Sequence, residues 1–267
     1  MKRDADLSRR LRRERRQVAL RSTLLQAVWN YDSLQAVGFA WAILPGLERI
    51  RPDPAERAER LHSHLESFNT NPYMATQAMG VALRMEEEIA RGAAGAEQRL
   101  TRLLRALRGS LGAIGDDLFW AAWRPALGLA AALAALATAS VWPAIVYLVA
   151  WNGLAQGVRV AGVRAGFAAG AGVARVLQDP FWASARRAAR LGGSFAAGVA
   201  LGAGAAWSVV GGGEWQGGAI FFLSVALLWL AGTRVGPRGR LLSPALAFLG
   251  VVVLLGAIHY LSQGAWP

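Results

Sequence analysis

Four long runs without a charged side chain mark the second half of the sequence. They cover residues 126–153, 191–213, 215–233 and 241–267. A helix that crosses a bilayer needs roughly 20 mainly apolar residues, and each run is about that long or longer. A buried core helix of a soluble protein could produce any one run, but four in one chain favour a membrane. The pattern predicts an all-α, polytopic membrane protein.

Two less apolar segments raise the expected number of membrane segments to about four to six. Residues 24–47 carry Asp32 as their only charge, and residues 153–177 contain three arginines. Each segment could cross the bilayer or re-enter it without crossing. Glycines 162, 166 and 170 would lie on one helix face, a spacing typical of close helix packing in lipid.

The first half has the spacing of amphipathic helices on the cytoplasmic side of the membrane. Pro54 opens a predicted helix. Its apolar positions are Ala58, Leu61, Leu65 and Phe68. Residues 99–111 carry a leucine stripe beside an arginine face. The Arg-rich residues 2–21 form either a helix on anionic lipid or a solvated tail.

These patterns predict three regions. Residues 1–23 form a basic amphipathic N-terminal segment, and residues 24–125 form a helical region with surface helices and re-entrant apolar hairpins. Residues 126–267 form the transmembrane helical region.

Arginine placement predicts the orientation of the chain. Arginines at 186–190 and 234–240 flank apolar runs, whereas the turn at 211–218 has no basic residue. The positive-inside rule places these arginines and the N-terminus in the cytoplasm, and the turn and the C-terminus outside. Such an orientation needs an odd number of crossings. Four runs are even, so one crossing is hidden or one run re-enters.

Composition narrows the class of protein. The 267 residues are 54% hydrophobic and 17% charged, with a net charge of +12 and no cysteine. Disordered chains have far lower hydrophobicity. The lack of cysteine excludes a disulfide scaffold, a thiolate metal site and a cysteine nucleophile. An arginine run can bind nucleic acid, but the apolar runs make a nucleic-acid partner the poorer interpretation.

Neither a metal site nor a catalytic set is predicted. His62 and His64 would diverge on a helix, and His259 is the remaining histidine. These histidines are expected at the surface, and Glu86 to Glu88 on a solvated helix face. No Ser/His/Asp set, phosphate-binding loop or zinc pattern is present, so no catalytic residue and no cofactor are expected.

Two segments carry polar residues that could bind a substrate. Asp116 follows three glycines and precedes an apolar run, where an acid usually faces a cavity or a partner. The alternative is a helix cap at the interface. We expect residues 109–125 to form a broken or re-entrant segment.

The second segment combines Asn30, Asp32 and Gln35 with Trp29 and Tyr31. Amides and carboxylates bind sugar hydroxyls, and aromatic faces cover sugar C–H groups. The alternative is an aromatic belt at the membrane interface. The predicted substrate-binding residues are therefore Asn30, Asp32, Gln35 and Asp116, in one cavity shared with a partner.

Several ordered motifs resemble the IID membrane component of mannose/fructose/sorbose-type sugar phosphotransferase systems (PTS). They are QAVWNYDSLQ (26–35), GFAWAILP (38–45), HLESFNTNPY (64–73), GVALRMEEE (80–88) and GAIGDDLFWAAWRP (112–125), followed by Asn152, Arg159 and GFAAG (166–170). The resemblance covers roughly residues 22–180. This chain departs from the usual family pattern at Asn71, Ser110 and Asp117, where the family has His, Pro and an uncharged small residue.

The resemblance implies a bacterial inner-membrane subunit that pairs with a IIC subunit, in a higher-order oligomer, to form a sugar path. A mannose-type hexose or related sugar would be the substrate. Separate IIA and IIB proteins would carry the phosphoryl group, so this chain would need no nucleophile. Membrane lipid is a further expected partner. The departures leave an alternative: a signalling or assembly subunit that kept the fold and lost transport.

Overall fold

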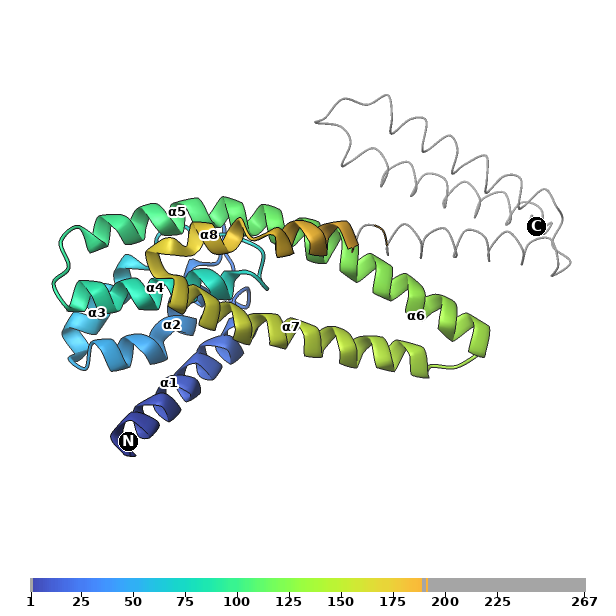
Figure 1. The fold of residues 1–267 in the computed structure, drawn as a ribbon, viewed down its shortest axis with the longest axis horizontal. Helices are drawn as coiled ribbons and strands as arrows, with labels where there is room; N and C mark the ends of the chain where they lie inside the picture. Colours follow the sequence, from blue (N-terminus) through green and yellow to red (C-terminus); the bar gives the residue numbers. More distant parts are fainter. Residues whose placement is uncertain (1, 189–190, 192–267) are drawn as a thin grey trace, which may run out of the picture. The chain divides into compact units, whose positions relative to one another are not determined.

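The structure is a computed structural model that describes residues 2–188 and 191. Its regular elements are helices, and the described residues contain no β pairing beyond two isolated bridges. Along the chain they are α1 (Lys2–Arg21), η1 (Ser22–Leu24), α2 (Ala36–Ile50), α3 (Pro54–Ser63), α4 (Ala75–Ala90), α5 (Ala96–Gly115), η2 (Asp116–Trp123), α6 (Arg124–Thr138), α7 (Trp142–Ala169), η3 (Gly170–Gly172) and α8 (Val173–Leu177) (Figure 1). The predicted all-α class is confirmed for these residues. The predicted runs at 191–213, 215–233 and 241–267 lie outside them, apart from residue 191.

Local sequence explains where α3 begins. The Asp53 carboxylate accepts hydrogen bonds from the backbone N–H groups of Ala55 and Glu56, both at 2.9 Å. Pro54 occupies the first helical position, where its missing N–H costs nothing. The predicted start is therefore confirmed. The helix ends at Ser63, so Leu65 and Phe68 lie beyond it.

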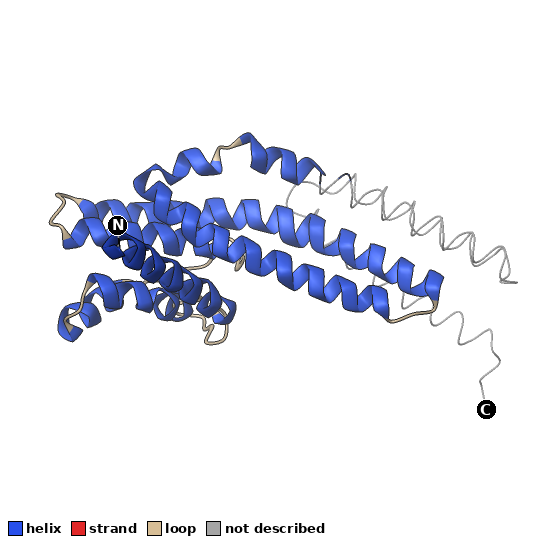
Figure 2. Cartoon of the chain, turned by 60° about the horizontal axis from the view of Figure 1, so that its bottom comes forward, coloured by secondary structure: helices blue, strands red, loops and turns tan. Residues whose placement is uncertain are grey.

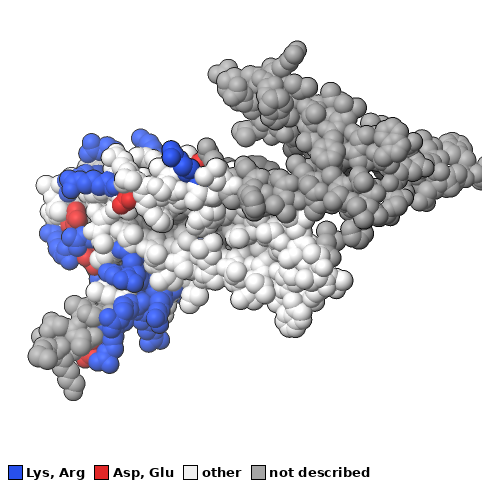
Figure 3. Space-filling model, turned by 45° about the vertical axis from the view of Figure 1, so that its right-hand side comes forward, with Lys and Arg blue, Asp and Glu red and all other residues white. Residues whose placement is uncertain are grey.

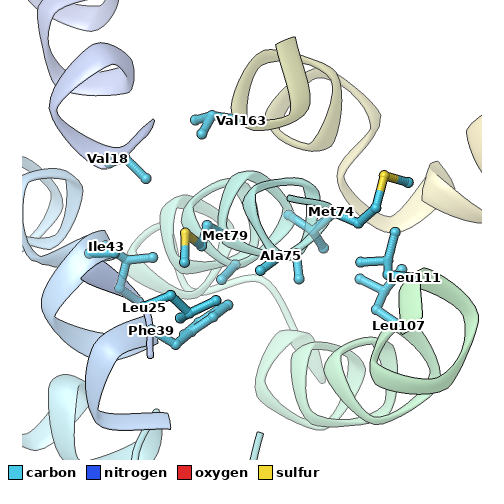
Figure 4. Packing of buried hydrophobic residues seen from close by; sticks show 14 of the residues in the cluster. Val18, Leu25, Phe39, Ile43, Met74, Ala75, Met79, Leu107, Leu111 and Val163 are labelled. Atoms are coloured by element: carbon cyan, nitrogen blue, oxygen red, sulfur yellow. The ribbon is translucent and has the colours of Figure 1, made fainter. Parts of the chain in front are cut away.

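Helix α4 lies at the centre of the hydrophobic core. Side chains of α1, α2, α5 and α7 converge on it from several sides (Figure 4). Among the buried residues are Met79 on α4, Phe39 on α2, Leu111 on α5 and Val163 on α7. Burial of each large side chain stabilises the fold by about 1.5–3 kcal/mol. The leucine stripe predicted for α5 contributes to this core, with Leu107 and Leu111 buried.

Glycines bring α4 and α7 into backbone contact. A Cβ atom at Gly166 would lie 2.0 Å from the carbonyl oxygen of Gln77, and one at Gly80 would lie 2.3 Å from that of Val163. At Gly162 it would lie 2.3 Å from the Thr76 hydroxyl. The glycine face of α7 is closely packed, and its partner is α4 of the same chain. Gly170 has a positive φ of 48° and ends α7.

The run at 126–153 is a helical hairpin instead of the expected single span. Helix α6 ends at Thr138 and α7 begins at Trp142, and the two helices lie side by side (Figures 1 and 2). Ala139 takes a positive φ of 46° in the turn. The Ser140 hydroxyl accepts a hydrogen bond from the Trp142 N–H at 3.3 Å, and Pro143 suits the first turn of α7. These turn features outweigh the unbroken hydrophobicity of the run.

The structure shows the helices within 24–125, whereas their expected re-entry into the bilayer stays a prediction. Residues 109–125 continue one helical path from α5 through η2, a π-helical segment, into α6. Residues 24–47 comprise a loop followed by α2, whose buried face packs on α1 and α4. The boundary predicted at 125/126 falls inside α6, and the three-region division stays a prediction.

The N-terminal helix is part of the packed structure. Val18 and Ala19 of α1 are fully buried, and Arg49 of α2 forms an ion pair with Glu14. A solvated tail is thereby excluded for this end of α1. Lys and Arg gather on the part of the molecule formed by α1 to α5, whereas the visible surface of the hairpin carries no charged residue (Figure 3).

Candidate functional site at the base of the hairpin

Asn30 shapes the loop that precedes α2. Its side-chain oxygen accepts hydrogen bonds from the backbone N–H groups of Asp32 and Ser33, at 3.0 and 2.8 Å. Its amide nitrogen donates to the Ser33 hydroxyl at 2.9 Å. Such bonds make a local turn. They leave Asp32 exposed at the loop tip, beside Tyr31, which is 89% exposed.

Gln35 joins this loop to the segment before α4. Its side chain is buried; the amide nitrogen donates to the Thr70 carbonyl at 2.9 Å, and the amide oxygen accepts from the Thr70 N–H at 3.0 Å. The backbones of Gln35 and Phe68 are hydrogen bonded as well. Gln35 thus satisfies both backbone groups of one buried residue, which would cost about 1–3 kcal/mol each if unpaired.

Asp116 lies at the other end of the same segment. The buried Asn71 side chain donates a hydrogen bond to the exposed Asp116 carboxylate at 2.9 Å. Gly115 makes room for this contact, since a Cβ there would lie 2.4 Å from the Asn71 side chain. Segment 70–71 therefore connects Gln35 to Asp116. Asn30 and Asp32 have no direct bond to either residue.

An aromatic cluster with an arginine borders Asp116. The Arg159 guanidinium donates to the Pro72 carbonyl at 2.7 Å and lies 4.9 Å from the centre of the Tyr73 ring. Tyr73 also contacts Trp120 and Trp151, with ring centroids 5.5 and 5.7 Å away. Arg159 and Trp151 are buried, so this cluster packs the base of the hairpin against the segment before α4.

The sequence signal for this cluster is Arg159, a charge inside an otherwise apolar stretch. A charge in such a place usually marks a partner or a function. Residue spacing gave no indication that Tyr73 and Trp151, which lie far apart in the chain, would meet around it.

A second polar cluster contradicts two surface predictions. Glu86 is fully buried; Arg60 donates to it at 2.7 and 3.0 Å, and the His64 Nε2 atom lies 2.9 Å from its carboxylate. Both His64 and Glu86 were expected at the surface. Burial would raise the pKa of Glu86, but the hydrogen bonds from His64 and Arg60 hold it below its usual value. His64 lines a cavity of about 160 Å³.

Metal binding has no support among residues 2–188. No group of three or more His, Asp or Glu side chains is placed there to hold an ion.

The two helical stretches long and apolar enough to cross a membrane in this part of the chain are Ala96–Ala135 and Trp142–Leu177. The first stretch includes most of α6 and the second includes α7, so the two stretches form the arms of the hairpin. Asp116 and Arg159 lie near its base.

Comparison with known proteins gives a consistent result. The family described as "PTS system mannose/fructose/sorbose family IID component" matches residues 11–203. The mannose-specific EIID component of Escherichia coli K12 is 31% identical over 185 residues, 69% of this chain and 65% of that protein. The match to a sorbose-specific EIID component of Klebsiella pneumoniae is 30% identical over 58% of this chain and 56% of that protein. The matches thus span less than two thirds of these relatives.

Two solved structures share the fold. A structure described as a membrane protein has a TM-score of 0.72 at 25% identity, and covers 93% of this chain and 96% of that one. The mannose transporter ManYZ in complex with microcin E492 has a TM-score of 0.56 at 24% identity, with the same coverage.

Proposed function

The chain belongs to the PTS mannose/fructose/sorbose family of IID components, and from this membership we propose that it forms a sugar path together with a IIC subunit. In this proposal separate IIA and IIB proteins carry the phosphoryl group to the arriving sugar. The match over residues 11–203 is the observation that carries the proposal. A mannose-type hexose is the proposed substrate class, because the relatives named above take mannose and sorbose.

The hairpin is the part of the chain that we place in the bilayer. Val146 and Val149 of α7 are 63% and 69% exposed, and Trp142 is 68% exposed. Large apolar side chains so exposed are stable when lipid or a partner covers them. From Trp142 to Val160, α7 extends roughly 27 Å at 1.5 Å per residue, close to the hydrocarbon thickness of about 30 Å.

A hairpin that crosses the bilayer twice supports an odd number of crossings. It returns to its starting side, so it adds an even number of crossings. The apolar runs 191–213, 215–233 and 241–267 then add three, and the total is odd. We therefore propose a cytoplasmic N-terminus and an external C-terminus in the bacterial inner membrane, with the α1–α5 helices on the cytoplasmic side.

The four predicted sugar-site residues remain a proposal with two kinds of role. Asp32 and Asp116 are exposed acids that can accept hydrogen bonds from a sugar or from the IIC subunit. Asn30 shapes the loop that carries Asp32, and Gln35 fixes the segment whose Asn71 binds Asp116. The exposed ring of Tyr31, packed edge-on against Trp29 at 4.9 Å, adds an apolar surface at the loop tip.

Uptake of radiolabelled hexose, recovered as the sugar phosphate, tests this function. Membranes should contain the chain, its IIC subunit and the IIA/IIB phosphate donors, with a control that omits only this chain. Transport that depends on the chain is the expected result. Full transport without it would instead support the rival role, a signalling or assembly subunit, which the family match does not favour.

A further inference from the structure

A groove rich in arginine lies where α1 meets α7. It has a volume of about 350 Å³ and is lined by Leu11, Arg12, Arg15 and Arg16 of α1 and by Val160 and Arg164 of α7. Four of the six lining residues are arginines and none is acidic. Because the arginines come from two helices far apart in sequence, the fold itself brings their charges together.

The acid nearest in sequence does not neutralise this groove. Glu14 is already engaged by Arg49 of α2. The Arg15 guanidinium stacks on the ring of Phe167, 4.4 Å from its centre, and its buried Nε atom has no hydrogen-bond partner. Burial lowers the pKa of Arg15, and the nearby Arg164 and Arg49 lower it further although Glu14 opposes them. The groove therefore holds excess positive charge with unused donors.

The groove lies at the depth of lipid headgroups if the hairpin crosses the bilayer. Val160 is roughly 27 Å along α7 from the hairpin tip and Arg164 is roughly 33 Å from it, at 1.5 Å per residue. The hydrocarbon layer is about 30 Å thick and headgroups begin beyond it. Leu11 and Val160 give the groove an apolar wall on which glycerol and the first acyl carbons can rest.

We propose that this groove binds the headgroup phosphate of an anionic phospholipid from the cytoplasmic leaflet. Guanidinium groups bind phosphate oxygens through paired N–H bonds, and several of them can share one phosphate. The bound lipid would fasten α1 to α7 at the membrane surface. The inference rests on the membrane position of the hairpin and makes no use of sugar transport.

Thermal unfolding of the purified full-length chain in neutral detergent tests the site. Phosphatidylglycerol, phosphatidylcholine and inorganic phosphate are added separately to the parent protein. We expect phosphatidylglycerol to raise the Tm by several degrees, as a ligand of the folded state does, and to do so less at high salt. Phosphatidylcholine and inorganic phosphate should have much smaller effects.

Two charge-matched double variants locate the effect. R12Q/R164Q removes one arginine from each wall of the groove, whereas R10Q/R13Q removes two exposed arginines of α1 that do not line it. The first variant should need at least tenfold more phosphatidylglycerol for the same Tm shift, and the second should behave as the parent. If R12Q/R164Q does not fold, the single variant R164Q, at an exposed position, tests the site instead. R164K should keep part of the Tm shift that phosphatidylglycerol causes.

Three results would overturn the proposal. An equal loss of the phosphatidylglycerol-dependent Tm shift in both double variants would mean that α1 is attracted to anionic surfaces in general. An equal shift with inorganic phosphate would mean a site for free phosphate, and no shift in the parent would mean no lipid site. Loss of sugar uptake in the transport assay leaves this outcome unaffected, so the two proposals fail separately.

Discussion

Single polar side chains fix the loops at the base of the hairpin. Gln35 binds both backbone groups of Thr70, and Asn71, the next residue, binds Asp116. Segment 70–71 thus connects the loop before α2 to the helical segment that leads into the hairpin. Asp116 is the member of this series with its side chain at the surface.

At this scale we predict that Asp116 contributes to sugar binding. A hydrogen bond to an uncharged sugar is worth about 0.5–1.5 kcal/mol, or up to roughly 3 with a charged partner. Asp116→Asn or Asn30→Ala should therefore weaken sugar binding from a fewfold to roughly a hundredfold, measured by calorimetry on the assembled IIC complex. Asp53→Asn is the control, since Asn caps a helix as well as Asp.

Unchanged affinity in both variants, with assembly retained, would contradict this prediction. Asp116 would then serve to anchor Asn71, and Asn30 would serve only to form its turn.

A second residue-scale prediction concerns the buried Glu86. Removing one partner of a buried charge network costs about 3–5 kcal/mol. Glu86→Gln should lower the Tm strongly at neutral pH, and exposed Glu59→Gln should not. The folded pKa of Glu86 is lowered, so its stabilisation is present above the unfolded pKa of about 4.3 and lost as pH falls further. The difference between parent and Glu86→Gln should narrow at acid pH; a constant difference would refute the assignment.

At the scale of elements, glycine spacing predicted a closely packed face on α7 but not that α4 covers it. The sequence shows three glycines on one face of α7, and that pattern alone cannot say whether another helix of the chain or another subunit covers them. The burial of Glu86 was unpredictable for a related reason. A run of three glutamates indicates a solvated face until Arg60 and His64 are known to lie opposite.

Gly166→Ala tests the contact. The new methyl group would overlap the Gln77 carbonyl, 2.0 Å away, and such overpacking costs about 1–3 kcal/mol. Gly157→Ala on the same helix meets no atom within 4 Å and should leave the Tm equal or higher. A Tm for Gly166→Ala equal to that of Gly157→Ala would show that α4 and α7 are not in backbone contact.

Ala139→Gly distinguishes a hairpin from a single helix over 126–153. Ala139 has a φ of 46°, which costs a residue with a Cβ roughly 1–2 kcal/mol. Glycine there should raise the Tm, whereas Ala132→Gly within α6 should lower it by about 0.5–1 kcal/mol. A continuous helix would make both substitutions destabilising.

At the scale of the molecule, hydrophobicity predicted the helical class but not that the run at 126–153 contains a turn, and the number of crossings stays a prediction. A turn made by Ala139, Ser140 and Pro143 contains no charge, so the apolar run gave no sign of it. In the proposed topology the hairpin returns to its starting side, so labelling at a few positions outside it decides the orientation of the chain.

Labelling with an impermeant thiol reagent tests that orientation in a chain without native cysteine. Single cysteines at Gln216 and Gln263, which lie outside the described residues, should react in intact cells. A cysteine at Ser110, exposed on α5, should react only after permeabilisation. Protection of both glutamine positions would reverse the proposed orientation.

The α4–α7 contact also constrains how the chain is made. Gly80 emerges from the ribosome well before Gly166, roughly 4–17 s earlier at about 5–20 residues per second. During that interval the face of α4 that will meet α7 has no cover, although α1 and α2 are already present. Helices α1 to α5 therefore reach their final packing only after α7 has been synthesised, and nascent chains stopped before α7 are expected to be targets for chaperones and proteases.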